Sequence, residues 1–280
     1  MERAPALLIG VGNVAKAVAS RLLSRTKVYG TTRDPQKMFE LWESRLEPVI
    51  MPWPQPAIIE PVAAEADVLV SFPPDGSTDA ALAPACRGAR SIVYISSTGV
   101  YGGKRGHIDD TTHPDADNPD TAARLQAEEI WRSVGATVLR APGIYGHDFG
   151  LHVRLKNGSY SIPGDGSGVI SRIHVDDLAT FIVASFDKQS KGQTYVVGDQ
   201  KPSSQLEVVQ WLCNRMQIPM PGHAALEDVS PTLRGSRSID PSRALKELGV
   251  QLRYPTYLEG FQACLSEIPE QESETPNGHS

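Results

Sequence analysis

The stretch "ALLIGVGNVAKAVASRLL", residues 6–23, decides the fold. An apolar run typical of a buried strand leads through two glycines into a helix-like segment. The run Gly10-Val11-Gly12-Asn13-Val14-Ala15 fits G-x-G-x-x-A between a strand and a helix, the context typical of a dinucleotide-binding turn. Gly10 would allow the tight turn, Gly12 would let backbone approach a pyrophosphate, and Ala15 would let helix and strand pack closely. An ordinary strand-turn-helix with glycines is the alternative.

The same stretch has some features of a secretory signal peptide. Arg3 precedes the apolar segment, and "AVAS" resembles a cleavage site. The uninterrupted apolar part is only about five residues long, however, and Lys16 lies inside the segment that should be apolar. No other segment reaches the roughly 20 apolar residues of a membrane span. We therefore expect a cytoplasmic protein without a membrane partner.

Composition excludes several classes of function. The chain has 280 residues, 40% of them hydrophobic, and a formal net charge of −6. An acidic chain without a basic run argues against a nucleic-acid partner. The three cysteines, Cys86, Cys213 and Cys264, lack C-x-x-C spacing, which argues against a disulfide framework or zinc site and fits a reducing compartment.

Strand-like and helix-like segments alternate along the first half of the chain. We predict strands within 6–10, 27–33, 47–53, 66–74, 90–98 and 135–146, and helices at 13–24, 35–44 and 121–133. A further strand and helix are predicted within 172–186, a strand within 192–199, and helices within 203–216 and 240–250. Apolar strands separated by helices predict an α/β fold with a doubly wound parallel sheet, whose ligands bind at the carboxyl ends of the strands.

The alternation stops after Tyr145. We predict a Rossmann cofactor-binding domain at 1–146, continued by 172–199, and a small C-terminal substrate-side subdomain from 147–171 and 200–268. The polar tail at 269–280 is expected to be disordered.

The end of the second predicted strand bears on the choice of dinucleotide. An NAD site usually has an acidic residue there, but this strand ends in Thr31, Thr32 and Arg33. An arginine beside hydroxyls suits a 2′-phosphate, so NADP is favoured over NAD. Alternatively, Arg33 is a solvated surface charge and Asp34 is simply the cap of the next helix.

Three later segments carry a family resemblance: "YISSTGVYGGKRGHIDDTT", "RLQAEEIWRSVGATVLRAPGIYG" and "RIHVDDLA". Their order and spacing resemble the extended short-chain dehydrogenase/reductase family, which includes nucleotide-sugar epimerases and dehydratases. That family works with a Ser or Thr, a Tyr that exchanges the proton, and a Lys. By position, Ser97 takes the Ser place, with Thr98 beside it as a second candidate. Asp120 stands at the Tyr position and Arg124 at the Lys position.

The usual catalytic tyrosine is therefore missing. A carboxyl group of ordinary acidity is a poor proton donor near neutrality, and arginine does not exchange protons there. Tyr145, and before it Tyr101, are candidate replacements near strand ends, with packing aromatics as the alternative. His147 is a further candidate, whereas the resemblance implies a structural role for His174. No residue spacing predicts a metal site.

The resemblance also implies the remaining cofactor contacts. The predicted set comprises Gly10, Gly12, Asn13, Val14, Thr32, Arg33, Phe72, Pro73, Ser96, Arg124, Pro142, Gly143 and Ile144. Nucleotide-sugar enzymes often carry an arginine four residues before the histidine of "RIHVDD", but that place is Ile170, so only Arg172 could serve the same side. The family often pairs through two helices, here within 80–87 and 121–133, so a homodimer is one option and the oligomeric state stays open.

Two classes of function follow. The first is an NADP-dependent oxidoreductase, epimerase or dehydratase that acts on a small polar substrate, sugar-like or carbonyl, with a non-standard active site. The second is a catalytically inactive NADP-binding sensor or regulatory protein. A polar, concave pocket over the nicotinamide would favour the enzyme, whereas an apolar surface there would favour the sensor. A purely structural scaffold fits Arg33 and Arg124 poorly.

Overall fold

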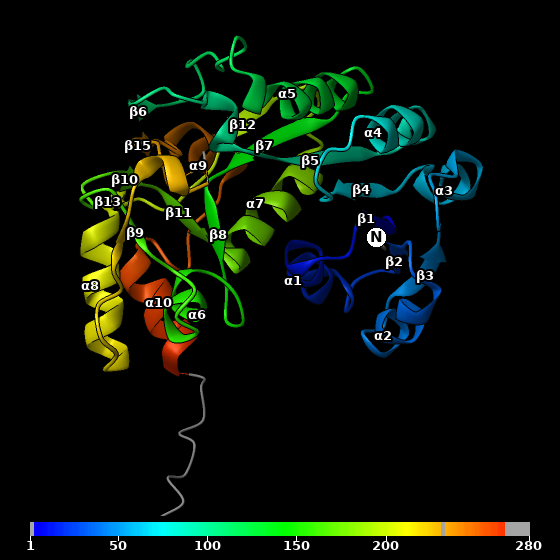
Figure 1. Ribbon diagram of the computed structural model, residues 1–280. Coiled ribbons are helices and arrows are strands. Elements are labelled where there is room, and N and C mark those ends of the chain that lie inside the picture. Colours follow the sequence, from blue (N-terminus) through cyan, green and yellow to red (C-terminus); the bar gives the residue numbers. More distant parts are fainter. Residues whose placement is uncertain (1–2, 231–232, 267–280) are drawn as a thin grey trace, which may run out of the picture.

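The computed structural model describes residues 3–230 and 233–266, and within them a seven-stranded sheet forms the centre (Figure 1). All pairings in this sheet are parallel. The strands in spatial order are β12 (Thr194–Val196), β7 (Thr137–Ala141), β5 (Ser91–Ser97), β4 (Asp67–Val70), β1 (Ala6–Ile9), β2 (Val28–Thr32) and β3 (Glu47–Ile50). The order reverses between β1 and β4, which is the switch point of a doubly wound sheet. The predicted fold class is confirmed.

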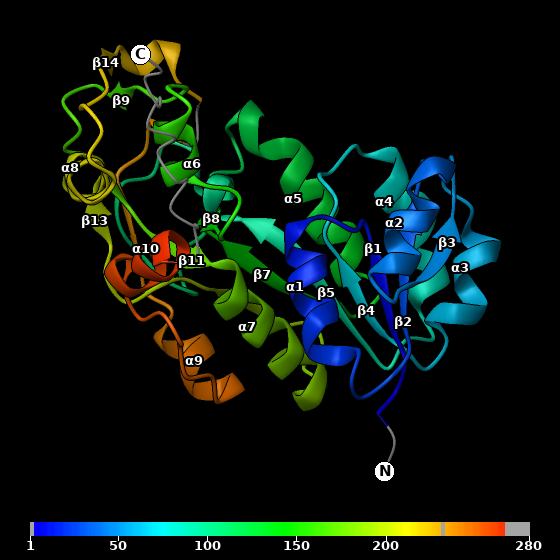
Figure 2. The same ribbon diagram turned by 90° about the horizontal axis from the view of Figure 1, so that it is seen from below.

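Helices cover both faces of the sheet because successive strand residues point to opposite sides. Leu8 of β1 belongs to one buried layer and its neighbour Leu7 to the other. The first layer includes α1 (Asn13–Leu22), α7 (Val175–Lys188) and α9 (Ser242–Leu248). The second includes α3 (Pro56–Ala63), α4 (Ser77–Leu82), the 3₁₀ turn η2 (Ala83–Cys86) and α5 (Pro119–Arg132). Figure 2 shows α1 and α7 side by side in front of the strands.

Capping residues set two of the helix starts. The helix predicted at 35–44 is present as η1 (Pro35–Lys37) and α2 (Met38–Glu43), and the Asp34 carboxylate accepts a hydrogen bond from the Gln36 amide. Near the C-terminus, the helix predicted within 240–250 is present as α9. It begins at Ser242, and the Asp240 carboxylate accepts a hydrogen bond from the Ser242 amide at 2.9 Å.

The strand predicted at 135–146 is two strands. β7 stays in the central sheet, whereas β8 (Gly143–Tyr145) pairs in parallel with β11 (Arg172–His174) in a separate sheet. Pro142 lies between them, and a proline cannot donate the amide hydrogen bond that a central strand needs. The chain therefore leaves the central sheet at Pro142, close to the predicted cofactor site.

The region predicted to be loop-rich after Tyr145 holds short elements: α6 (Leu151–Lys156), β9 (Ile162–Pro163) and β10 (Val169–Ile170). In the described part of the chain, a four-stranded sheet has the order β13 (Ser203–Ser204), β10, β15 (Arg237–Ile239) and β6 (Gly106–Ile108). β14 (His223–Ala224) pairs with β9, and the 3₁₀ turn η4 (Leu226–Asp228) follows. α8 (Gln205–Met216) and α10 (Tyr257–Ser266) enclose a separate apolar cluster with α6. The predicted disordered tail lies outside the described residues.

Candidate functional site

The turn between β1 and α1 needs glycine at its first position. Gly10 has a φ of +87°, and a Cβ there would lie 3.0 Å from the Cβ of Phe72. The Gly10 amide donates to the Thr31 hydroxyl at 3.0 Å, and the Ser71 hydroxyl donates to the Gly10 carbonyl at 2.7 Å. β2 and β4 thus hold the turn from both sides.

The start of α1 is open toward the site. A Cβ on Gly12 would meet nothing within 4 Å, and no side chain caps the helix. The first amide groups, at Asn13 and Val14, are therefore available for an anion, and the helix dipole favours negative charge there. This open start, on a turn that admits only glycine at Gly10, fits the pyrophosphate of a dinucleotide.

The end of β2 leaves Arg33 as the group available for a phosphate. The Thr32 hydroxyl is occupied because it accepts from the Asp34 amide at 3.1 Å and donates to the Asp34 carbonyl at 3.2 Å. The Asp34 carboxylate caps η1. Arg33 is exposed, and its side chain has no hydrogen-bond or ion-pair partner within the residues described.

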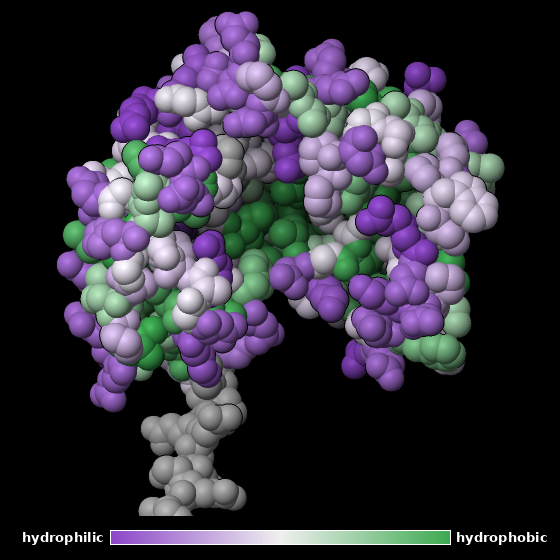
Figure 3. Space-filling view, viewed as in Figure 1, coloured by the Kyte–Doolittle hydropathy of each residue, from purple (hydrophilic) through white to green (hydrophobic). Residues whose placement is uncertain are grey.

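The remaining predicted cofactor residues lie at the carboxyl end of the sheet, with one exception. Phe72 and Pro73 follow β4, while Pro142 separates β7 from β8, whose first residues are Gly143 and Ile144. Figure 3 shows a hollow, with apolar residues on its floor, between the half that carries α1 and the half that carries α6 and α10. The Ser96 side chain is buried on the opposite face and donates to Glu128 Oε1 at 2.6 Å. The Ser96 hydroxyl is thus used by Glu128, and a cofactor contact by this residue stays a prediction.

Three predicted catalytic residues lie together. Ser97, Asp120 and Arg124 line one pocket of about 380 Å³. Ser97 ends β5, and its Oγ accepts from the Gly99 amide at 3.0 Å, which leaves its hydroxyl proton free to donate. Asp120 and Arg124 lie one turn apart near the start of α5, so they share a face of that helix. Arg124 Nη1 donates to the Tyr94 hydroxyl at 3.5 Å.

Thr98 and Tyr145 do not line this pocket. Thr98 is buried as the first residue of the 3₁₀ turn η3 (Thr98–Tyr101). Tyr145 is 2% exposed, its ring stacks on Phe261 with centroids 4.1 Å apart, and burial raises the pKa of its hydroxyl. Neither side chain is among those that line the pocket, and a catalytic role for them stays a prediction.

Among the alternative tyrosines and histidines, Tyr101 and His174 have structural roles. Tyr101 is buried and accepts from Arg140 Nη1 at 3.2 Å. His174 caps α7 by accepting from the Asp176 amide at 3.2 Å. His147 lies in the loop after β8 and is not among the residues that line the pocket. In the described chain, no three His, Cys, Asp or Glu side chains lie together as metal ligands would.

The pocket also holds residues that sequence reasoning missed: Arg105, Asn118, Arg234 and Arg237. The parallel pairing of β15 with β6 brings residues 234–237 beside the loop that follows β5. The only sequence signal was the arginine density of "LRGSRS", which a solvated surface loop would also show. Arg172, considered for the substrate side, is buried and donates to the Ile170 carbonyl instead.

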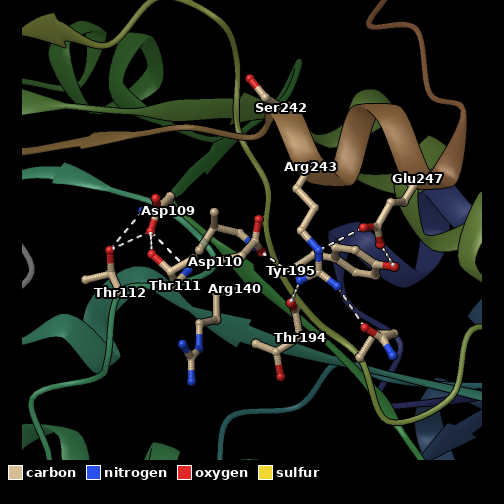
Figure 4. A network of polar contacts seen from close by, with 12 residues as sticks. Asp109, Asp110, Thr111, Thr112, Arg140, Thr194, Tyr195, Ser242, Arg243 and Glu247 are labelled. Atoms are coloured by element: carbon tan, nitrogen blue, oxygen red, sulfur yellow. Dashed lines mark hydrogen bonds and ion pairs between the residues drawn. The ribbon is translucent and has the colours of Figure 1, made fainter.

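Figure 4 shows a polar network that connects the end of β6 with β12 and α9. Asp110, just after β6, accepts from the Val196 amide at 2.8 Å, and burial raises the pKa of its carboxyl. Arg243 of α9 lies 3.9 Å from this carboxylate and donates to Glu247, which also accepts from the Tyr195 hydroxyl. The network joins α9, β12 and the end of β6, and hence positions β6 for its pairing with β15.

Comparison with known proteins agrees with this geometry. Residues 75–198 match the model of the NAD dependent epimerase/dehydratase family. Over 170 residues the chain is 28% identical to a 3-diazoavenalumate denitrifying reductase from a Streptomyces species, a match that covers 52% of the chain and 55% of that reductase. A functionally unknown conserved protein from Silicibacter pomeroyi has a similar structure over 94% of this chain and 99% of its own, with 28% identity and a TM-score of 0.82. MoeE5, solved with UDP-glucose and NAD, is similar over 94% and 98%, with 19% identity and a TM-score of 0.78.

The sheet order and the glycine turn define a Rossmann-like α/β fold, and the segment 75–198 within it is similar to the epimerase/dehydratase type. The match over residues 75–198 agrees with the resemblance of the sequence to the extended short-chain dehydrogenase/reductase family. Within the described residues, no helix is both long and apolar enough to cross a membrane.

Proposed function

We propose that the protein is an NADP-dependent oxidoreductase that acts on a carbonyl group, or on the corresponding alcohol, of a small polar substrate. The observation that carries this proposal is the shared pocket of Ser97, Asp120 and Arg124. The pocket is concave and several charged side chains line it, which suits an active site better than an apolar partner-binding surface.

The choice of NADP rests on the end of β2. Asp34, the one acidic side chain there, is used as a helix cap, whereas Arg33 is exposed and without a partner among the described residues. A guanidinium suits a 2′-phosphate, which NAD lacks. The NAD in the MoeE5 structure belongs to a protein only 19% identical to this one.

The bound nicotinamide would supply or accept the hydride. The Ser97 hydroxyl can donate to the substrate oxygen because the bond that it accepts from the Gly99 amide does not use its proton. Arg124 stays charged and stabilises negative charge that develops on that oxygen, but it does not deliver a proton. Asp120 is an exposed carboxylate in this pocket, so we propose that water entering the pocket supplies the proton that tyrosine supplies elsewhere.

Titration with NADPH and NADH, followed by tryptophan fluorescence, tests the cofactor part. Arg33→Ala should weaken NADPH binding by about 10- to 100-fold, the effect of one charge-assisted contact, and leave NADH binding unchanged. Arg25→Ala, which removes an exposed arginine beyond the other end of α1, is the matched control and should change neither. Equal loss for both nucleotides on Arg33→Ala, or no binding of either, would refute the assignment.

A measurement of NADPH turnover distinguishes between the enzyme and the sensor interpretations. A panel of small aldehydes and ketones should oxidise NADPH, and Arg124→Gln should lower kcat by about 100-fold or more, as loss of an oxyanion-stabilising group does. If NADPH binds tightly but no compound in the panel is reduced, the sensor becomes the better interpretation.

A further inference from the structure

Positive charge is concentrated around the pocket. Its lining includes Arg105, Arg124, Arg234 and Arg237 but, among acidic residues, only Asp120. In the part of the chain that the structure describes, none of the four guanidinium groups lies within ion-pair distance of a carboxylate. The whole chain carries a formal net charge of −6, so this concentration is local and opposes the overall charge.

Arg237 is the decisive member because it is buried. Arg237 is 8% exposed, and its Nη1 donates to the Gly102 carbonyl at 2.5 Å. The guanidinium lies against Gly235, where a Cβ would come within 2.6 Å of Nη1 and 2.8 Å of Cζ. Burial lowers the pKa of Arg237, with no acidic neighbour to offset it. One acceptor leaves most of its five N–H donors available.

A buried, uncompensated charge is unfavourable for folding. Neutral residues could hold the Gly102 carbonyl at a smaller cost, so the placement of Arg237 is explained by an anion that enters the pocket. The other guanidinium groups approach from different elements. Arg124 lies on α5, and Arg234 is held beside the pocket by the carbonyls of Val229 and Glu227, each at 2.9 Å.

We infer that the pocket binds a small dianion, a phosphate monoester or a dicarboxylate, with Arg237 and Arg124 as its main anion contacts. The inference rests on the proposed function only for the reaction at Ser97, because anion binding needs no nucleotide. A volume of about 380 Å³ is at the lower end of the range for small-molecule sites, which suits a small ligand. The substrate would then be a carbonyl compound that carries two negative charges.

Calorimetric titration of the full-length protein tests the inference. The probes are inorganic phosphate, succinate and the monoanion acetate, each with and without saturating NADPH. We expect phosphate or succinate to bind at least 10-fold more tightly than acetate, and the stronger of the two identifies the source of the charge. Binding should weaken as salt is added, because the contacts are ionic.

Arg237→Gln should weaken binding of the preferred dianion by about 10- to 100-fold. Arg87→Gln removes an exposed arginine outside the pocket lining and should have no effect. Gly235→Ala keeps every charge but displaces the Arg237 guanidinium, so it should also weaken binding even if Arg237→Gln folds poorly.

Three results would overturn the inference: no dianion binding in either condition, equal affinity for acetate, or full affinity in both pocket variants. Failure of the proposed function looks different. If the protein binds a dianion through Arg237 but binds neither nucleotide, the anion site is supported and the proposed oxidoreductase function is refuted.

Discussion

A double-mutant cycle at Gly260 and Tyr145 tests whether Tyr145 is a packing residue or a site residue. Gly260 lies within α10, where alanine would ordinarily stabilise the helix by about 1 kcal/mol. Here a Cβ would overlap the Tyr145 hydroxyl oxygen and lie 2.8 Å from Cζ. Overpacking of this kind costs about 1–3 kcal/mol, so Gly260→Ala should destabilise the protein despite its better helix propensity.

Tyr145→Phe should have the opposite effect. The Tyr145 hydroxyl is buried and has no hydrogen-bond partner among the described residues. Because an unsatisfied buried hydroxyl costs about 1–3 kcal/mol, its removal should raise the free energy of unfolding by about 1 kcal/mol. In this background Gly260→Ala no longer meets the oxygen, so its cost should fall by at least about 1 kcal/mol.

Urea unfolding of the four proteins gives the coupling energy between the two sites. Effects that add within about 0.5 kcal/mol would show that the two residues do not compete for space and would refute the packing argument. NADPH binding is the functional control, and it should be equal in Tyr145→Phe and the parent. A folded Tyr145→Phe protein that loses NADPH binding would return Tyr145 to the site.

Four further substitutions, at three places, test buried polar groups. Burial raises the pKa of the Asp199 carboxyl to about 7, so its contribution to stability is present at low pH and is lost as pH rises from about 4 to 7. Over that range the free energy of unfolding of Asp199→Asn should increase by up to about 4 kcal/mol relative to the parent. A difference that stays constant with pH in unfolding titrations would contradict this. Trp131 Nε1 donates to buried Asp79 at 2.7 Å, so Trp131→Phe should cost about 1–3 kcal/mol in urea unfolding beyond any packing loss, whereas Asp79→Asn should retain an acceptor and cost less. Glu128→Gln removes the charge that Arg140 pairs with in the core and should cost about 3–5 kcal/mol by the same assay; a loss below 1 kcal/mol would show that the pair is not important.

The central sheet was predictable because its signals are local. Each parallel strand is buried on both faces and is therefore a short apolar run, and the glycines at Gly10 and Gly12 mark the turn that follows the first one. Capping chemistry placed η1 correctly at Asp34. The break at Pro142 was also visible in the sequence, but the apolar residues on either side of it continue the strand pattern.

The pocket was only half predictable, for a physical reason. Ser97, Asp120 and Arg124 follow from positions in a known order of motifs. Arg237 does not, because it reaches the pocket only through the pairing of β15 with β6, between residues more than 100 positions apart. No local pattern distinguishes an arginine that will be buried there from one on a surface loop.

A buried polar network holds α5 against the end of β5, where Ser97 lies. Ser96 and Ser97 are neighbours on β5, so their side chains point to opposite sides. Ser96 donates to Glu128, which also receives two hydrogen bonds from Arg140, at 3.0 and 2.8 Å. Glu128 lies one helical turn after Arg124 on α5. The same strand end therefore anchors α5 through Ser96 on one face and presents the Ser97 hydroxyl on the other.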